Sequence, residues 1–185
     1  MTEQRGEDRR RSVEDLEQRT DNLRRLLDEV ERRRQEAERE GRNFTAPTAE
    51  QIRRKLSRTN SPWIVYQTWN QASPGGTVNY DVGINNPDPD RWIWLFVHVF
   101  VGPANVAPDV GDAVNSVDSR FPRLTMPRFD GLSIDPGDTQ VLSFSLTVPA
   151  GIEPSNYLGN SILFQSTWHD VGTYLDRGLF VFEVT

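Results

Sequence analysis

Hydrophobic and polar residues follow two different patterns along this chain, and the pattern changes near residue 60. Before that point, single apolar residues recur at steps of three and four within a highly charged segment, which is the period of an amphipathic helix. After it, short stretches alternate between apolar and polar residues and are bounded by Gly, Pro, Asn and Asp, which is typical of β-strands joined by turns. The chain is therefore predicted to hold a long helix followed by a β-domain.

The N-terminal helix is expected to begin at Ser12, which can cap the first turn, and to end at Gly41. Its apolar stripe is narrow and bordered by charge, which favours a partner helix over a broad sheet. We therefore predict a parallel homo-oligomeric coiled coil, with a trimer as the expected oligomer. The a and d positions of four heptads form the predicted oligomer seam: Val13, Leu16, Thr20, Leu23, Leu27, Val30, Arg34 and Ala37. The alternative is a single amphipathic helix that lies on its own β-domain.

The linker over residues 42–61 is expected to contain a second, short helix. Thr48 and Gln51 have the spacing of a capping box, from which the helix would extend to about Arg58. Its basic residues form either a binding patch for a polyanion or a solvated, internally paired face: Arg53, Arg54, Lys55 and Arg58.

The region from residue 62 to 185 contains nearly all the large apolar side chains, so the core must lie there. Alternating stretches at 78–85, 141–148 and 179–184 predict strands, and no helical pattern separates them. Short strands joined by turns predict a mainly β fold, an antiparallel β-sandwich, behind the long N-terminal α-helix. The predicted organisation is residues 1–41 as the helix, 42–61 as the linker with its short helix, and 62–185 as the sandwich.

The stretch from Arg91 to Val101 differs from the other predicted strands because both of its alternating rows are apolar. A sandwich strand with one wet face would not have this composition, so something has to cover the second face. We expect the cover to be the loop after Gly102 or a second subunit. The row assigned to a possible sheet interface is Ile93, Leu95, Val97 and Val99.

Two segments of the β-domain carry a family resemblance. Residues 76–87 read Gly-Thr-Val-Asn-Tyr-Asp-Val-Gly-Ile-Asn-Asn-Pro, and residues 134–139 read Ile-Asp-Pro-Gly-Asp-Thr. Together with Tyr157 they resemble prokaryotic immunoglobulin-like modules of the cell-adhesion-related kind, over about residues 62 to 185. The resemblance implies an immunoglobulin-like sandwich that serves as a non-catalytic spacer or binding unit. Tyr157 resembles a tyrosine corner, in which the phenol bonds back to a nearby main-chain group.

Charge excludes one class of partner. The net charge of the chain is −6, and five basic against thirteen acidic side chains after residue 60 give the β-domain a charge of −8. An acidic domain is a poor match for nucleic acid, whose binding depends on neutralising phosphates. Lys55 is the only lysine among 21 basic residues, which fits a GC-rich genome or, together with the acidic domain, a halophile.

The chain has no cysteine, so packing and not disulfides must hold the fold. No apolar stretch follows the charged N-terminus, so a secretory signal peptide is not predicted. The longest apolar run, residues 92–101, is about half as long as a membrane helix needs, so no membrane insertion is expected. We expect a chain that assembles in the cytoplasm and reaches a virion or an extracellular assembly without that export signal.

Candidate reactive residues are few. His98 lies within the apolar strand and is expected to be packed there, whereas His169 stands near a turn, and no motif places either beside a nucleophile. Loop aspartates offer oxygen ligands for Ca²⁺, but no EF-hand spacing organises them: Asp88, Asp90, Asp109, Asp112 and Asp118. The sequence therefore predicts no enzyme, no catalytic residue, no cofactor and no metal site.

These observations predict a non-enzymatic structural assembly protein. Its expected partners are copies of itself and other structural proteins of the same assembly. That assembly is expected to be a prokaryotic virus particle, with the chain as a fibre, spike or capsid decoration, or a contractile injection machine. The alternative is a carbohydrate-binding or adhesion β-sandwich module that stacks sugars on Trp63, Trp69 or Trp168.

Overall fold

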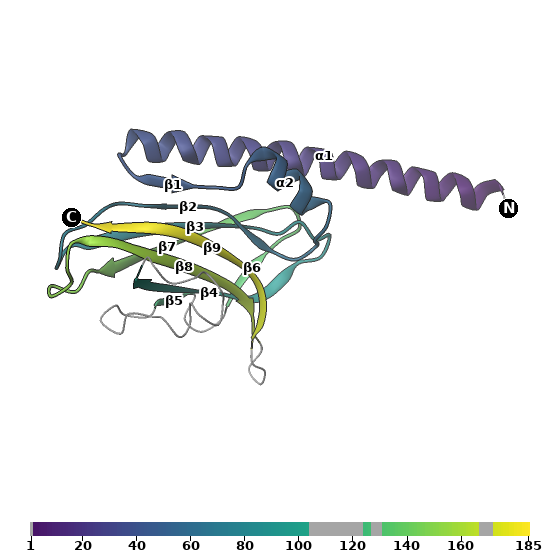
Figure 1. The fold of residues 1–185 in the computed structure, drawn as a ribbon. Coiled ribbons are helices and arrows are strands. Elements are labelled where there is room, and N and C mark those ends of the chain that lie inside the picture. Colours follow the sequence, from purple (N-terminus) through teal and green to yellow (C-terminus); the bar gives the residue numbers. More distant parts are fainter. Residues whose placement is uncertain (1, 104–123, 127–130, 167–171) are drawn as a thin grey trace.

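A computed structural model of the chain describes residues 2–103, 124–126, 131–166 and 172–185, with side chains from residue 17 onward except at 103 and 124–126. It shows a β-sandwich of two antiparallel sheets, with a long helix running across the outer face of one sheet (Figure 1). The mainly β fold, the antiparallel sheets and the long N-terminal helix are as the sequence predicts.

The helices are α1 (Thr2–Arg39) and α2 (Ala49–Leu56). Sheet A lies beneath them and has the order β1 (Asn43–Thr45), β2 (Trp63–Trp69), β3 (Thr77–Asn85) and β7 (Thr139–Thr147). Sheet B has the order β5 (Leu124–Met126), β4 (Trp92–Pro103), β8 (Ser155–Gln165) and β9 (Thr173–Val184), and β6 (Leu132–Ile134) also pairs with β4. Two boundaries differ from prediction: α1 begins well before Ser12, and the predicted linker contributes β1 to sheet A.

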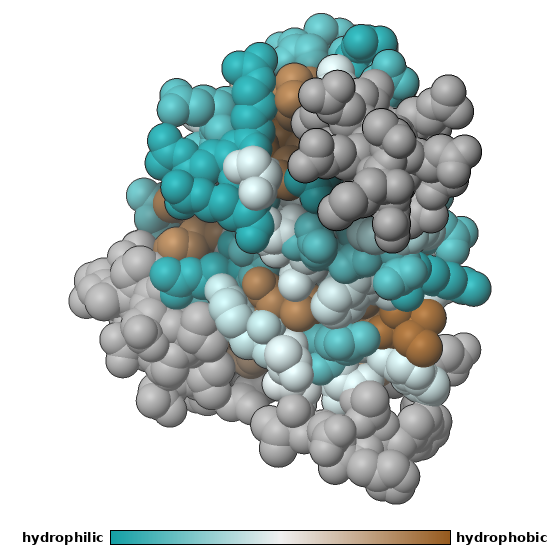
Figure 2. Space-filling model, turned by 90° about the vertical axis from the view of Figure 1, so that its right-hand side faces the viewer, coloured by the Kyte–Doolittle hydropathy of each residue, from teal (hydrophilic) through white to brown (hydrophobic). Residues whose placement is uncertain are grey.

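The sandwich core lies between the two sheets. Val82 and Ile84 from sheet A meet Leu95 and Leu163 from sheet B, and all four side chains are fully buried. Tyr80 adds a polar connection, because its hydroxyl hydrogen-bonds both to Gln67 of sheet A and to Ser161 of sheet B. Burial raises the pKa of Tyr80 well above its usual value, so this phenol stays protonated. On the outside, the face shown in Figure 2 is mostly hydrophilic with small apolar patches.

Strand β4 corrects the predicted sheet interface. Leu95, Val97 and Val99 are buried in the core of the same chain and face sheet A, so they cannot form an interface with a second subunit. Ile93 is 46% exposed and does not continue their row. The physical reason is an irregularity between Trp92 and Leu95, where Trp94 has a φ of 61°. Such a bulge changes which face the following side chains occupy.

The C-terminal half of α1 packs against its own β-domain. Leu26 and Val30 are buried against Ile52 of α2 and against Trp63 and Val65 of β2. This is the alternative interpretation of the apolar stripe, a helix lying on its own domain. We call this contact the helix–sheet cluster.

The residues of the predicted oligomer seam differ in how far they are buried within the chain. Val30 and Ala37 are buried within the chain, and Leu23 and Leu27 pack partly against the helix–sheet cluster. Leu26, which was not assigned to the seam, is only 3% exposed. Thr20 and Arg34 are exposed, whereas the side chains of Val13 and Leu16 lie outside the described residues. The coiled coil therefore stays a prediction, with few described apolar residues left to support it.

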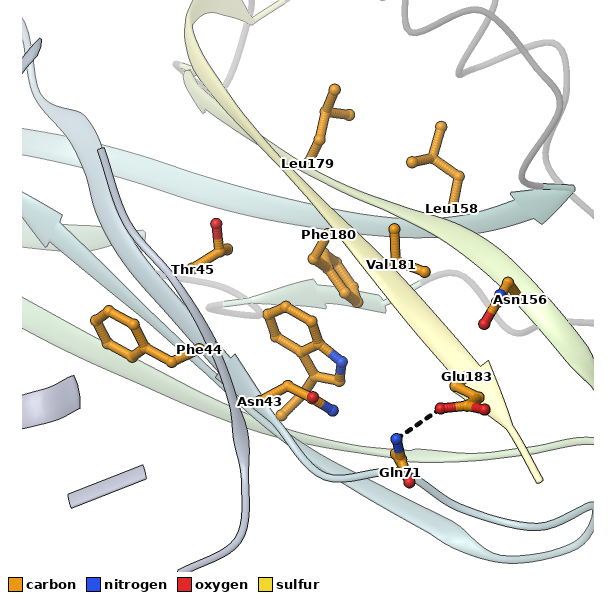
Figure 3. A pocket seen from close by; sticks show the side chains of 11 residues that line it. Asn43, Phe44, Thr45, Gln71, Asn156, Leu158, Leu179, Phe180, Val181 and Glu183 are labelled. Atoms are coloured by element: carbon orange, nitrogen blue, oxygen red, sulfur yellow. Dashed lines mark hydrogen bonds between the residues drawn. The ribbon is translucent and has the colours of Figure 1, made fainter. Parts of the chain in front are cut away.

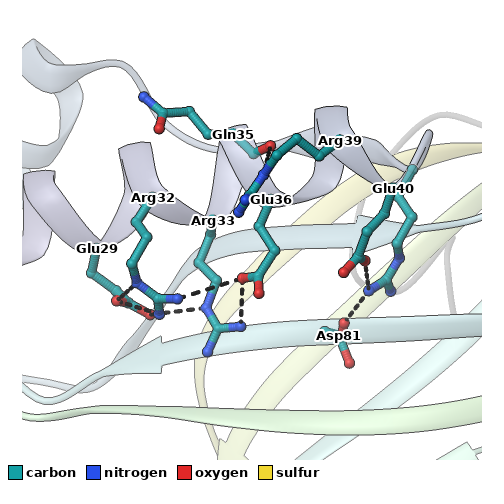
Figure 4. A network of polar contacts seen from close by, with 9 residues as sticks. Glu29, Arg32, Arg33, Gln35, Glu36, Arg39, Glu40 and Asp81 are labelled. Atoms are coloured by element: carbon teal, nitrogen blue, oxygen red, sulfur yellow. Dashed lines mark hydrogen bonds and ion pairs between the residues drawn. The ribbon is translucent and has the colours of Figure 1, made fainter.

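Figure 4 shows polar contacts at the docked end of α1, where Arg42 in the turn after the helix is joined to sheet A. Arg42 donates to Asp81 at 2.6 Å and to the main-chain oxygen of Asn79 at 3.0 Å. Arg33 binds Glu29 at 2.9 Å and lies 5.9 Å from the ring centre of Tyr66 on β2. Partial burial alone would raise the pKa of Glu29, but hydrogen bonds from Arg32 and Arg33 and their charges hold it below its usual value.

Three local predictions are confirmed. Gly41, at a φ of 65°, follows the end of α1 and adopts the left-handed conformation common at helix ends. Thr48 and Gln51 form the capping box of α2, with Gln51 N donating to Thr48 Oγ1 at 3.3 Å and Thr48 N donating to Gln51 Oε1 at 2.8 Å. The Tyr157 hydroxyl donates to the Glu153 main-chain oxygen at 2.8 Å, as a tyrosine corner does.

Candidate functional site

Three adjacent strands of sheet B each place an aromatic side chain on the outer face, in register. Phe96 of β4 pairs with Phe164 of β8, and Phe164 pairs with Tyr174 of β9. Successive side chains of a strand point to opposite faces, and Leu95 and Leu163 point into the core, so these neighbours point outward. We call Phe96, Phe164 and Tyr174 the aromatic row.

The rings of the aromatic row are held in place by packing. Phe96 and Phe164 stack with ring centres 5.5 Å apart and an interplanar angle of 17°. His98, on the same face, meets the Phe164 ring edge-on at 4.6 Å. Gly172 leaves space for Phe164, because a Cβ there would come within 2.4 Å of the ring. A substitution at Gly172 would therefore displace the central ring.

Exposure differs along the aromatic row. Tyr174 is 48% exposed, whereas Phe96 and Phe164 are half-buried. Partial burial raises the pKa of Tyr174, and the charge of Asp176 raises it further, so the phenol is a stable hydrogen-bond donor. Gln165, beside the row, donates to the main-chain oxygen of Ile93 at 3.1 Å. The row thus combines partly exposed apolar rings with polar groups at its margin, which suits a ligand that has both apolar and hydroxyl-bearing surfaces.

The stacking residues suggested by the sequence are not those the structure presents. Trp63 is 1% exposed and Trp69 is 5% exposed, so neither is a platform for a ligand. Trp168 lies outside the described residues. The aromatic row was missed because it depends on how β4, β8 and β9 pair, and nothing in the sequence fixes that register.

The remaining candidates have structural roles where they are described. Asp88 accepts from Asp90 N at 2.9 Å and so helps to shape the turn after β3. Within the described ranges, no three His, Cys, Asp or Glu side chains gather as metal ligands. Outside those ranges lie His169, Asp109, Asp112 and Asp118.

The basic residues of α2 are partly paired inside the chain. Lys55 binds Asp176 at 2.6 Å and lies 4.9 Å from the ring centre of Trp63. Arg54 pairs with Glu50 at 3.2 Å. Arg53 and Arg58 are exposed, so the alternative of a solvated, internally paired face describes this helix better than a compact polyanion patch.

Comparison with known proteins supports the fold. No family model and no curated protein matches the chain. The C-terminal domain of wzt is similar at a TM-score of 0.53 and 12% identity, over 69% of this chain and 75% of that one. This similarity shows an immunoglobulin-like β-sandwich, in agreement with the family resemblance, and at this identity it shows the fold alone.

Other solved structures are similar at lower scores. The CARDB domain of PF1109 from Pyrococcus furiosus matches at a TM-score of 0.40 and 15% identity, over 67% of this chain and 92% of that one. A family 123 glycoside hydrolase from Clostridium perfringens matches at 0.41 and 12%, over 78% of this chain and 27% of that one. Both scores are too low to support a conclusion. Neither described helix has an apolar stretch that could span a bilayer.

Proposed function

We propose that this chain is a non-catalytic carbohydrate-binding β-sandwich module that holds glycan on the aromatic row. The observation that carries the proposal is the register of Phe96, Phe164 and Tyr174 across three neighbouring strands. This is the alternative function that the sequence offers, on different aromatic residues. The described residues contain no feature that favours the virus-particle component over it.

The geometry of the aromatic row fits a sugar chain. Neighbouring strands lie about 4.8 Å apart, so the three aromatic positions span roughly 10 Å across the sheet. That length has room for a pair of sugar rings, whose C–H faces are apolar while their hydroxyls point sideways. The apolar rings of the row match the first property, and the Tyr174 hydroxyl at its exposed end matches the second.

A glycan array printed with bacterial and plant polysaccharides tests the proposal on the whole chain. The strongest binders are then cast into native gels, where a binding protein migrates more slowly. We expect Tyr174→Ala to abolish the retardation and Tyr174→Phe to keep most of it, because stacking needs the ring. Val181→Ala, an exposed site outside the row, is the control. Retardation of Tyr174→Ala equal to that of the unmodified chain would exclude the aromatic row as the glycan site.

A further inference from the structure

A second concave surface lies at the sandwich edge, between β1 of sheet A and β9 of sheet B. Figure 3 shows Phe44 on one side of it and Leu179, Val181 and Glu183 of β9 on the other. Its volume is about 440 Å³. A neighbouring cavity of about 360 Å³ shares Thr45 and Leu179 with it, so the two lie next to each other along β9. We call the two cavities together the edge groove.

The edge groove exposes main-chain groups of β9. The Leu179 oxygen accepts from Gln67 Nε2 at 3.4 Å, and Thr185 N donates to the Ala72 oxygen at 3.3 Å, so both point away from β8. Main-chain groups alternate in direction along a strand. Those of Val181 and Glu183, which lie between, therefore also point away from β8. Among the described residues, no main-chain group hydrogen-bonds to those of Val181, whereas an isolated parallel bridge between Ala72 and Val184 closes this edge of β9 just after Glu183.

Side chains along the edge groove add apolar contact. Val181 is 54% exposed, the highest value among the large hydrophobic residues described. Leu179 and Phe44 are half-buried beside it. Exposed strand edges with apolar side chains are the places where a further strand can add to a sheet.

The charges of the edge groove differ at its two ends. Glu183 is the only ionisable side chain among the described residues that line the first cavity, where its carboxylate accepts from Gln71 Nε2 at 2.7 Å. At the other end, Lys55 and Asp176 neutralise each other in an ion pair of 2.6 Å. Arg177 lines that end and forms no ion pair with a described residue. The two unneutralised charges stand six residues apart on β9, or roughly 20 Å.

We propose that the edge groove binds an extended peptide segment of a partner protein, which pairs with the main chain of β9 as an additional strand. A peptide presents an N–H donor and a C=O acceptor side by side, which match the free N–H and C=O of Val181, as no sugar chain does. Small apolar side chains of the peptide face Val181 and Phe44, and a basic side chain lies beside Glu183. This site is separate from the aromatic row and from glycan binding.

A phage-displayed library of random twelve-residue linear peptides, panned on the whole chain, supplies the probe. We expect it to enrich peptides with alternating small apolar residues and a basic residue near one end. Affinity is then measured by fluorescence anisotropy with a labelled synthetic copy. N-methylation of the alternate amides that face β9 should weaken binding about tenfold for each hydrogen bond lost. This comparison uses the unmodified protein, so it does not depend on a variant that folds.

Matched variants locate the site. Val181→Pro removes an edge N–H, and edge positions whose N–H faces outward tolerate proline. We expect it to weaken peptide binding about tenfold, while Val181→Ala, which keeps the N–H and loses only side-chain contact, should weaken binding less than Val181→Pro does. Glu183→Gln should weaken only peptides that carry the basic residue, and Tyr174→Ala should change nothing. Enrichment of no peptide, or binding that survives both N-methylation and Val181→Pro, would overturn the proposal.

Discussion

The two halves of α1 have the same charged composition but different surroundings. From Leu23 to Ala37 the helix packs on sheet A through the helix–sheet cluster, and just after the helix Arg42 pairs with Asp81 of β3. Its N-terminal part extends past the sandwich in Figure 1. At 1.5 Å per residue the 38-residue helix is about 57 Å long, well beyond the reach of the sheet beneath it.

A pattern of apolar residues at steps of three and four identifies the face of a helix that is buried, but not what that face packs against. A seam and a sheet-packing face share most of their positions, because both recur every three to four residues. The structure distinguishes them through Leu26, which is buried although it was outside the predicted seam, and Arg34, which is exposed although it was inside. The buried face of α1 is therefore rotated with respect to the predicted seam.

The largest expected effect concerns the helix–sheet cluster. Val30 is 4% exposed, so Val30→Asp would bury a carboxylate among apolar side chains of α2 and β2. We expect the free energy of unfolding in urea to fall by at least about 3 kcal/mol. Thr20→Asp, on the exposed part of the same helix, is the control and should change it little. Equal stability of the two variants would mean that α1 does not belong to the folded unit.

A smaller loss of stability is expected when the polar contacts of Arg42, just after α1, are removed. Arg42 is mostly buried and satisfies Asp81 and two main-chain oxygens, so Arg42→Ala should cost about 1 to 3 kcal/mol in urea unfolding. Arg24→Ala is the matched control, because its pair with Asp21 is exposed on both sides and contributes little. If Arg42→Ala lowers the free energy of unfolding no more than Arg24→Ala does, the contacts of Arg42 do not stabilise the fold.

A still smaller effect follows from Glu29. Its pKa is lower in the folded chain than in the unfolded chain, so the stabilisation is present above the ordinary pKa near 4.5 and is lost as the pH falls below it. Because the carboxylate is partly exposed, we expect less than about 1 kcal/mol. In a plot of the free energy of unfolding against pH, Glu29→Gln should reduce the fall on the acid side. Glu31→Gln, whose ion pair is exposed, should leave that fall unchanged.

Much of the fold was predictable because it depends on local patterns. The capping box at Thr48, the helix end at Gly41 and the alternating strands are each encoded within a few residues. The packing of α1 on sheet A was harder to predict, although the sequence of β2 indicates that something covers this strand. Strand β2 is buried at every position from Trp63 to Trp69, which means that both of its faces are covered. As in β4, both alternating rows of β2 are mainly apolar, so its second face also needs a cover.

The candidate sites were not predictable for a different reason. The aromatic row requires the pairing of Phe96 with Phe164 and of Phe164 with Tyr174, which are far apart in sequence. The edge groove requires knowing which strands end each sheet. Strand register and strand order are set by the packing of the whole domain, and small irregularities such as the bulge in β4 change them without a clear sequence signal.

The smallest effect on stability is expected from the N-terminal part of α1, and it decides whether that part has a partner. Removing residues 2–16 should leave the urea unfolding curve nearly unchanged, because the helix–sheet cluster begins at Leu23. The same deletion should reduce the mass measured by light scattering to that of a monomer if the coiled coil forms. The double substitution of Val13 and Leu16 by Asp is the finer test, because these seam positions precede the segment packed on sheet A. An oligomer that persists through both changes would show that copies of the chain meet elsewhere. If the unmodified chain is already a monomer, the N-terminal part of α1 does not form a coiled coil.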